Sequence, residues 1–234
     1  MTTRVWDRFL TERDKAHLAL RPRRPVAFGQ RPALILVDVY RGVYGDQPEP
    51  LLEAVKAWPS SCGLEAWTAI PYLQQLIQAA RDAAIPVIHT TGVSDMVTWG
   101  DATRGNGKDV PRGDPSQSDR VRRHNDIIDE VAPLPGELVI RKASPSAFWG
   151  TPLVAHLNHL RADTLIVAGE STSGCVRGTV VDGCTYRFKV LVPEECVFDR
   201  QEATHAMNLF DMHQKYAEVL PVADVLAYMA RVKS

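Results

Sequence analysis

Pro32-Ala-Leu-Ile-Leu-Val-Asp38 is a short, continuous apolar run that ends in an acidic residue. Such a run is typical of a strand that is buried on both faces of a parallel sheet. Further runs of similar character lie at 85–89, 137–141, 164–168, 189–193 and 217–221. The sequence therefore predicts a sheet of six strands, and it places Asp38 at the carboxyl end of the first.

Segments with apolar residues at spacings of three and four lie between most of these runs, and they predict amphipathic helices. They cover residues 69–84, 153–160, 176–187 and 202–216. Strands that alternate with helices indicate right-handed crossover connections. We therefore expect an α/β fold with a doubly wound, mainly parallel six-stranded sheet and helices on both faces. In such a fold the active site lies beyond the carboxyl ends of the strands.

The length of the chain favours one domain. Its 234 residues are 45% apolar, and a division would leave two halves that each have less core to bury. We expect an N-terminal arm over residues 1–30 and a single domain over 31–234. Residues 93–123 depart from the strand and helix pattern, with several glycines, prolines and charges. They predict a long loop excursion, for which a lid, an oligomer contact and disorder all stay open.

The charge balance disfavours large anionic partners. Lys and Arg total 27 against 28 for Asp and Glu, so we expect no nucleic-acid partner and no membrane partner. The first twenty residues mix charged with apolar side chains, unlike a signal peptide, and no run approaches the ~18 apolar residues that span a bilayer. These features predict a cytoplasmic protein. Its four cysteines have no metal-binding spacing, so we expect free thiols.

Three reactive side chains follow predicted strands. Asp38 comes after the first strand, Lys142 after the third, and Gly169-Glu-Ser-Thr-Ser-Gly-Cys175 after the fourth. The last segment leads into a predicted helix, so the thiol of Cys175 lies near a helix N-terminus. The partial positive charge there lowers the pKa of a thiol, and the unpaired backbone amides can bind an oxyanion. The sequence thus predicts a nucleophilic thiolate at this edge of the sheet.

Each of these residues also has an ordinary structural interpretation. An Asp at a strand end often caps a helix, and a Lys after a strand is usually a solvated surface charge. Cys62, Cys184 and Cys196 are expected to be small buried apolar residues. His89 ends a predicted strand near the site, and we expect a hydrogen-bonded structural role for it. Only the combination of Asp38, Lys142 and Cys175 points to catalysis.

That combination resembles a known family. Asp38 in Leu34-Ile-Leu-Val-Asp-Val, Lys142 in Arg141-Lys-Ala-Ser-Pro-Ser-Ala-Phe-Trp-Gly-Thr151 and Cys175 in Val167-Ala-Gly-Glu-Ser-Thr-Ser-Gly-Cys-Val-Arg177 are similar to the three signature segments of isochorismatase-like cysteine hydrolases. The resemblance spans residues 28 to 229. It implies a three-layer sandwich and a triad of Cys175 as nucleophile, Asp38 as base and Lys142 as cationic partner. It also implies homo-oligomers, either dimers or tetramers.

Within this superfamily, Ser171-Thr-Ser-Gly-Cys175 followed by Val197-Phe-Asp-Arg200 resembles the N-carbamoylsarcosine amidase branch, which includes maleamate amidohydrolases. The resemblance implies that Arg200 binds a substrate carboxylate, a role that suits its planar fork of donors. A surface helix-capping role for Arg200 stays open on the residues alone. The resemblance also implies a cis peptide after Glu170, an oxyanion hole made by the amides of Ser171 and Cys175, and a pocket position for Thr172.

No metal and no cofactor are expected. Nicotinamidases carry a metal-binding segment after the early strand-end Asp, whereas Val39-Tyr-Arg-Gly-Val-Tyr-Gly45 lacks such ligands. Aromatic residues are candidates for lining the substrate pocket, although some of them can equally pack in the core or at an interface. These candidates are Tyr40, Trp99, Phe148 and Trp149. In the N-terminal arm, Trp6, Phe9 and Leu10 are expected to contact either a neighbouring subunit or their own domain.

The predicted function is that of a cysteine-dependent amidohydrolase. It would cleave the C–N bond of a small carboxylated amide or N-carbamoyl compound and release ammonia through a thioester intermediate. Maleamate amidohydrolase is the alternative activity, because it uses the same triad and carboxylate anchor. A non-catalytic ligand-binding or interaction protein is the alternative of another class.

Overall fold

The structure is a computed structural model, and it describes residues 3–20, 22–93, 120 and 122–232. Most of the predicted excursion over 93–123, including Trp99, lies outside the described residues.

The core of the fold is a seven-stranded sheet in the order β3-β2-β1-β4-β5-β7, with β6 paired to β4. Every pair of these strands is parallel. The predicted α/β class and parallel sheet are confirmed, but the strand count of six is wrong by one, because the two residues of β6 are too few to form an apolar run. The strands are β1 (Pro32–Val37), β2 (Val87–Gly92), β3 (Leu138–Lys142), β4 (Thr164–Glu170), β5 (Lys189–Pro193), β6 (Val197–Phe198) and β7 (Glu218–Leu220).

The helices include four that the apolar spacing predicts, with ends shifted by a few residues: α4 (Leu64–Asp82), α7 (Leu153–His159), α8 (Arg177–Thr185) and α9 (Glu202–Lys215). Others among the described residues lie outside the segments that the apolar spacing predicts. These are α1 (Glu12–Leu20), α2 (Arg41–Tyr44), α3 (Leu51–Ala57) and α10 (Val222–Met229).

The packing of strand β1 shows why residues 32–37 are apolar throughout. Alternate side chains of a strand point to opposite faces of the sheet. Leu34 and Leu36 lie in a core cluster with α4 and α10. Ala33, Ile35 and Val37 lie in a second cluster with α7, α8 and α9. Both faces of the strand are therefore buried, which is why its residues are apolar up to Asp38.

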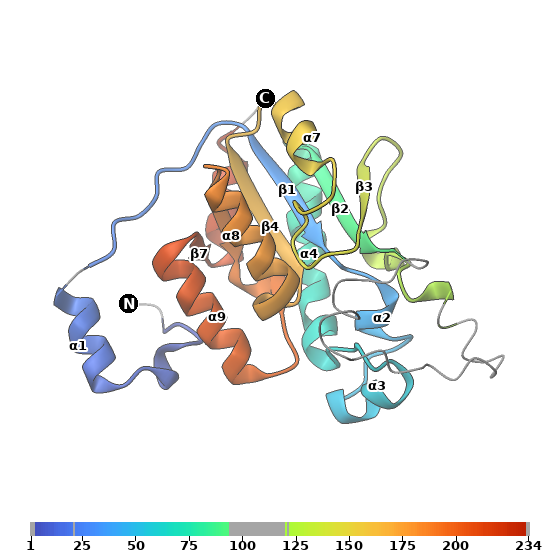
Figure 1. Cartoon of the computed structure of the whole chain (residues 1–234), viewed down its shortest axis with the longest axis horizontal. Coiled ribbons are helices and arrows are strands. Elements are labelled where there is room, and N and C mark those ends of the chain that lie inside the picture. The colour runs from blue at the N-terminus through green and yellow to red at the C-terminus, as the bar shows by residue number, and fades with distance from the viewer. Residues whose placement is uncertain (1–2, 21, 94–119, 121, 233–234) are drawn as a thin grey trace.

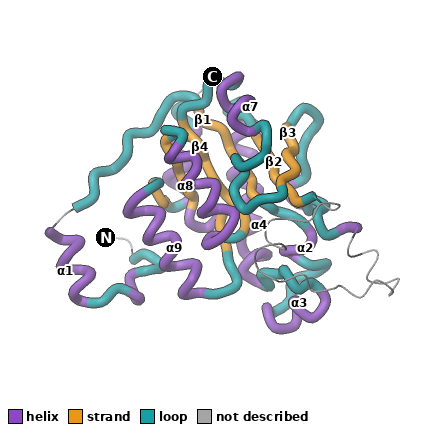
Figure 2. Tube along the Cα trace, viewed as in Figure 1, coloured by secondary structure: helices purple, strands orange, loops and turns teal. Residues whose placement is uncertain are grey.

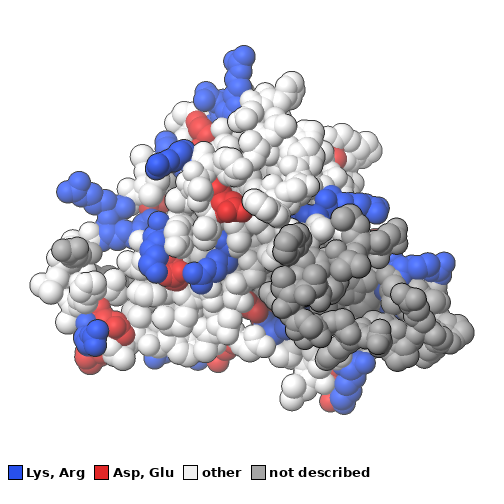
Figure 3. All heavy atoms as spheres, in the orientation of Figure 1, with Lys and Arg blue, Asp and Glu red and all other residues white. Residues whose placement is uncertain are grey.

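The sheet lies between two layers of helices, as the three-layer expectation requires. Figures 1 and 2 show α8 and α9 in front of the sheet and α4 behind it. The face drawn in Figure 3 has positive and negative side chains interspersed over its described part, with no broad area of one sign. Among the described residues, no helix is long and apolar enough to cross a membrane.

The N-terminal arm packs on its own domain. The Trp6 ring is buried, with its centroid 6.1 Å from that of Phe210 and 5.4 Å from that of His213. Farther along the arm, Arg23 pairs with Glu218 at 2.6 Å. Helix α1 lies between these two anchor points, away from the sheet in Figure 1, and it buries none of its residues.

Candidate active site

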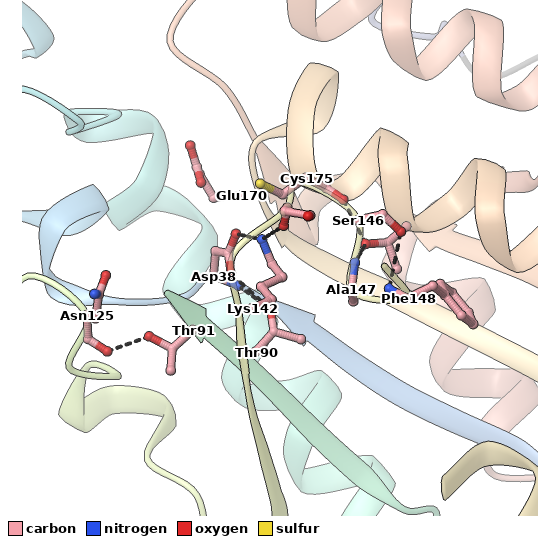
Figure 4. Close-up of polar contacts among 12 residues, drawn as sticks. Asp38, Thr90, Thr91, Asn125, Lys142, Ser146, Ala147, Phe148, Glu170 and Cys175 are labelled. Atoms are coloured by element: carbon pink, nitrogen blue, oxygen red, sulfur yellow. Dashed lines mark hydrogen bonds and ion pairs between the residues drawn. The ribbon is translucent and has the colours of Figure 1, made fainter. Parts of the chain in front are cut away.

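The predicted triad comes together at the carboxyl edge of the sheet. Asp38 directly follows β1, and Lys142 is the last residue of β3. Cys175 lies in a π-helical turn, Thr172–Val176, which joins β4 to α8. Figure 4 shows the three side chains pointing toward one another. These strands are parallel and lie within the run β3-β2-β1-β4 of the sheet. Residues far apart in the sequence therefore lie close together at their carboxyl ends.

Asp38 and Lys142 form a buried ion pair. The Lys142 Nζ lies 2.6 Å from Asp38 Oδ2, and the two side chains are only 4% and 3% exposed. The other carboxylate oxygen accepts a hydrogen bond of 2.9 Å from the Thr90 hydroxyl, and Lys142 also donates to the carbonyl oxygen of Ser144. These contacts satisfy both charges away from water, which a buried pair requires. They also hold the carboxylate in one orientation.

Burial raises the pKa of the Cys175 thiol above its ordinary value, and the negative charge of Asp38 raises it further. The positive charge of Lys142 acts in the opposite direction but does not outweigh them. The expectation that the helix N-terminus lowers this pKa is therefore wrong for the free protein. A thiol whose pKa is raised needs a base to act as a nucleophile, and Asp38 is hydrogen-bonded to Cys175.

The peptide bond between Glu170 and Ser171 is cis, as expected. Just before it, Gly169 has a φ of 112°, and an added Cβ would lie 2.1 Å from the carbonyl oxygen of Val37. Glycine is required here because β4 and β1 approach each other too closely for any side chain. The segment that carries Ser171 and Cys175 thus begins at a position fixed by the sheet itself.

The next residues of the segment are held by Asp199 and His205. One Asp199 oxygen accepts a hydrogen bond of 2.9 Å from the Ser173 amide, and the other accepts one of 2.8 Å from the Arg200 amide. The Thr172 hydroxyl, which is buried, lies 2.8 Å from Nδ1 of His205. The predicted pocket residue Thr172 therefore lies in the site segment, with its hydroxyl engaged by α9.

Arg200 lies at the site but is not free. Its Nη1 pairs with Glu170 Oε1 at 3.0 Å, and its Nη2 donates a short hydrogen bond to the carbonyl oxygen of Ser60. Burial raises the pKa of Glu170 to about 7, although the positive charge of Arg200 opposes this. Tyr40 lies close enough for Asp38, Glu170 and Cys175 to contribute to the raised pKa of its phenol, after burial. The structure thus brings Tyr40 to the triad, and it brings Arg200 to Glu170 beside the triad.

Phe148 and Trp149 lie elsewhere. The Phe148 ring is buried in the core on the α8 side and stacks on Tyr186, with ring centroids 5.2 Å apart. Figure 4 shows this ring pointing away from Cys175. The Trp149 side chain is 68% exposed. The structure does not bring these two aromatic side chains to the triad.

His89 lies inside β2 rather than at its end, because the strand continues to Gly92. Its Nε2 is 3.2 Å from Glu137 Oε2, and its ring is buried. This is the hydrogen-bonded structural position that the sequence predicts. Over the described part of the chain, there is no group of three or more His, Cys, Asp or Glu side chains that could hold a metal ion.

Three residues of the site go beyond the sequence prediction: Glu170, Asp199 and His205. A signal existed for Glu170, since an acid that ends an apolar strand is the same pattern that identifies Asp38. Cys62, one of the other free cysteines, lies with its Sγ 4.0 Å from Glu170 Oε1. The contact between Cys62 and Glu170 could not be predicted, because the two residues come from distant parts of the chain.

Comparison with known proteins places this geometry in a family. Residues 32–224 match the model of the isochorismatase domain. The chain is 33% identical over 223 residues to an N-carbamoylsarcosine amidase from Arthrobacter sp, covering 88% of this chain and 74% of that protein. It is 32% identical over 207 residues to a maleamate amidohydrolase from Pseudomonas putida, covering 86% of this chain and 88% of that protein.

A solved structure has the same fold. The crystal structure of a cysteine hydrolase from Pseudomonas syringae superposes with a TM-score of 0.67 at 21% identity, covering 90% of this chain and 97% of that one. The region that matches the isochorismatase domain model begins at β1 and ends within α10, so it contains the whole sheet and every residue of the triad. The chain belongs to the isochorismatase domain family.

Proposed function

We propose that this protein is a cysteine-dependent amidohydrolase that acts on a small carboxylated amide or N-carbamoyl compound and releases ammonia. The observation that carries the proposal is the convergence of Cys175 with the buried Asp38–Lys142 pair at the carboxyl edge of the sheet. The similarity to an N-carbamoylsarcosine amidase and to a maleamate amidohydrolase supports this substrate class.

In the proposed first step, Asp38 takes the proton of the Cys175 thiol as the sulfur attacks the carbonyl carbon of the substrate. Lys142 stabilises the negative charges of both partners, since Asp38 and Cys175 each raise the pKa of its ammonium group, more than offsetting the lowering by burial. The amides of Ser171 and Cys175 would bind the oxyanion of the tetrahedral intermediate, a contribution of about 3 kcal/mol per donor.

The protonated Asp38 then gives its proton to the departing ammonia, which leaves a thioester on Cys175. Water attacks the thioester with Asp38 again as the base, and the acid product leaves with the thiol restored. For an N-carbamoyl substrate this product is a carbamate, which decomposes to carbon dioxide and an amine. No step requires a group outside the triad and the two amides.

Arg200 is the proposed anchor for the substrate's carboxylate. It lies near Tyr40, with its guanidinium held by Glu170 and by the carbonyl oxygen of Ser60. A planar guanidinium keeps further N–H donors when two are in use, so it can still receive a carboxylate.

The test is ammonia release from a panel of N-carbamoylsarcosine, other N-carbamoyl amino acids, maleamate and nicotinamide, each with and without EDTA. We expect release from a carboxylated member that EDTA does not reduce. Release only from nicotinamide would contradict the substrate class. If no member of the panel releases ammonia, a ligand-binding role is favoured.

A further inference from the structure

The two positive side chains described at the triad and its anchor already have carboxylate partners. Lys142 pairs with Asp38 at 2.6 Å, and Arg200 pairs with Glu170 at 3.0 Å. A substrate carboxylate that binds Arg200 would therefore enter an existing ion pair. It would place a second negative charge beside a carboxyl group that is only 5% exposed.

The surroundings of Glu170 offer little else to neutralise that charge. Several titratable or charged groups from different elements face it or influence its charge. Arg200 is the positive group that pairs with Glu170, and Lys142 of β3, which lies beside Asp38 and Cys175, is already paired with Asp38. The other groups are neutral or acidic. They are Asp38 and Tyr40 after β1, Tyr44 in α2, Cys62 before α4, Cys175 in the π-helical turn, and Asp199 after β6.

Two carboxylates that share one half-buried guanidinium repel each other, and the repulsion is relieved when one of them is protonated. We propose that Glu170 takes up one proton from solvent when the carboxylate of a substrate binds Arg200, and thereby sets the selectivity of the site for carboxylated over neutral amides. This inference rests on the proposed function. A protonated Glu170 also gains an O–H donor, which can face the bound carboxylate.

The direction of the pH effect follows from the free protein, in which burial raises the pKa of Glu170 to about 7. Below that pH Glu170 is already neutral, so a carboxylate binds without further proton uptake. Above it, binding requires a proton, and the affinity for a carboxylated substrate falls by up to about tenfold per pH unit. A neutral substrate adds no charge beside Glu170 and escapes this dependence.

The test compares kcat/KM for a carboxylated amide with that for its methyl ester, from about pH 6 to about pH 9. Both substrates use the same triad, so titration of the triad cancels in the ratio. In the wild type the ratio should fall up to about tenfold per pH unit above neutrality, and in Glu170→Gln it should be flat. The control is Glu137→Gln, which alters a carboxylate paired with Arg81 at the opposite edge of the sheet and should keep the wild-type profile.

A second measurement does not depend on the folding of the Glu170 variant. Calorimetric titration of Cys175→Ala at about pH 8, in two buffers of different ionisation enthalpy, should show uptake of about one proton with the carboxylated amide and none with the ester. A pH-independent ratio in the wild type, or no proton uptake, would overturn the inference while leaving the amidohydrolase proposal intact. If no carboxylated amide is bound or turned over, both proposals fail.

Discussion

The ammonium nitrogen of Lys142 lies 2.6 Å from a carboxylate oxygen of Asp38, and both side chains are almost completely buried. The cysteine that this pair faces has a raised pKa, because its thiol is buried and lies beside the negative charge of Asp38. In the mechanism proposed above, the same carboxylate disfavours the thiolate of the free protein and accepts the proton during attack. We therefore expect Cys175 to be a poor nucleophile at rest and a competent one when a substrate carbonyl is in place.

Replacement of Asp38 by Asn should change reactivity and turnover in opposite directions. The loss of the negative charge lowers the pKa of Cys175, so alkylation by iodoacetamide at neutral pH should become faster. The loss of the base should reduce ammonia release by about 100-fold or more. Both rates are measured on the same preparation. Slower alkylation in Asp38→Asn would contradict the assigned electrostatics.

Replacement of Lys142 by Met should destabilise the protein, because it leaves the Asp38 carboxylate buried without its partner. The expected loss is about 3 kcal/mol of unfolding free energy, measured by urea denaturation. The double variant Asp38→Asn with Lys142→Met should lose less than the sum of the single losses. Strict additivity would mean that the two side chains do not act as a pair.

Replacement of Arg200 by Ala should raise KM for carboxylated amides by about 10- to 100-fold, since a charge-assisted bidentate contact contributes about 1.5 to 3 kcal/mol. The methyl esters of the same amides serve as the internal control, because they lack the charge that Arg200 binds. An equal rise of KM for acids and esters would show that the substitution damages the site in general.

Replacement of Gly169 by Ala tests how the sheet positions the cysteine segment. An added Cβ would lie 2.1 Å from the Val37 carbonyl oxygen, at a φ of 112°. Gly136 is the matched control, because its φ is 97° but nothing lies within 4 Å of an added Cβ. Thermal unfolding should show a loss of about 3 kcal/mol or more for Gly169→Ala, and about 1 kcal/mol for Gly136→Ala. Similar losses would mean that backbone conformation, not the close approach, is what matters.

The fold was largely predictable because its strands are buried on both faces. An apolar run such as 32–37 carries that information locally, and so do the longer amphipathic helices. The pair Val197–Phe198 forms β6 only because β4 extends beside it to Glu170, which is a property of the sheet and not of the two residues. Short elements of this kind depend on tertiary contacts and leave little trace in the sequence.

The candidate site likewise contains residues that the sequence predicts and contacts that depend on tertiary packing. Asp38, Lys142 and Cys175 could be predicted because each lies at or after the carboxyl end of a strand, and parallel strands end at one edge. The pairing of Arg200 with Glu170, and of Thr172 with His205, depends on side-chain packing between separate elements. Phe148 was indistinguishable from a pocket residue in the sequence, although its ring faces Phe188 and Tyr186 in the core.

The most direct test of Cys175 as the nucleophile is the initial rate of ammonia release by Cys175→Ala, relative to the wild type and with EDTA in both reactions. The substrate is the best member of the carboxylated panel, and a melting curve checks that the variant is folded. We expect a fall on the order of 1000-fold or more, because no other group described at the site replaces the nucleophile. A folded Cys175→Ala variant that releases ammonia at a rate close to that of the wild type would contradict this role of Cys175.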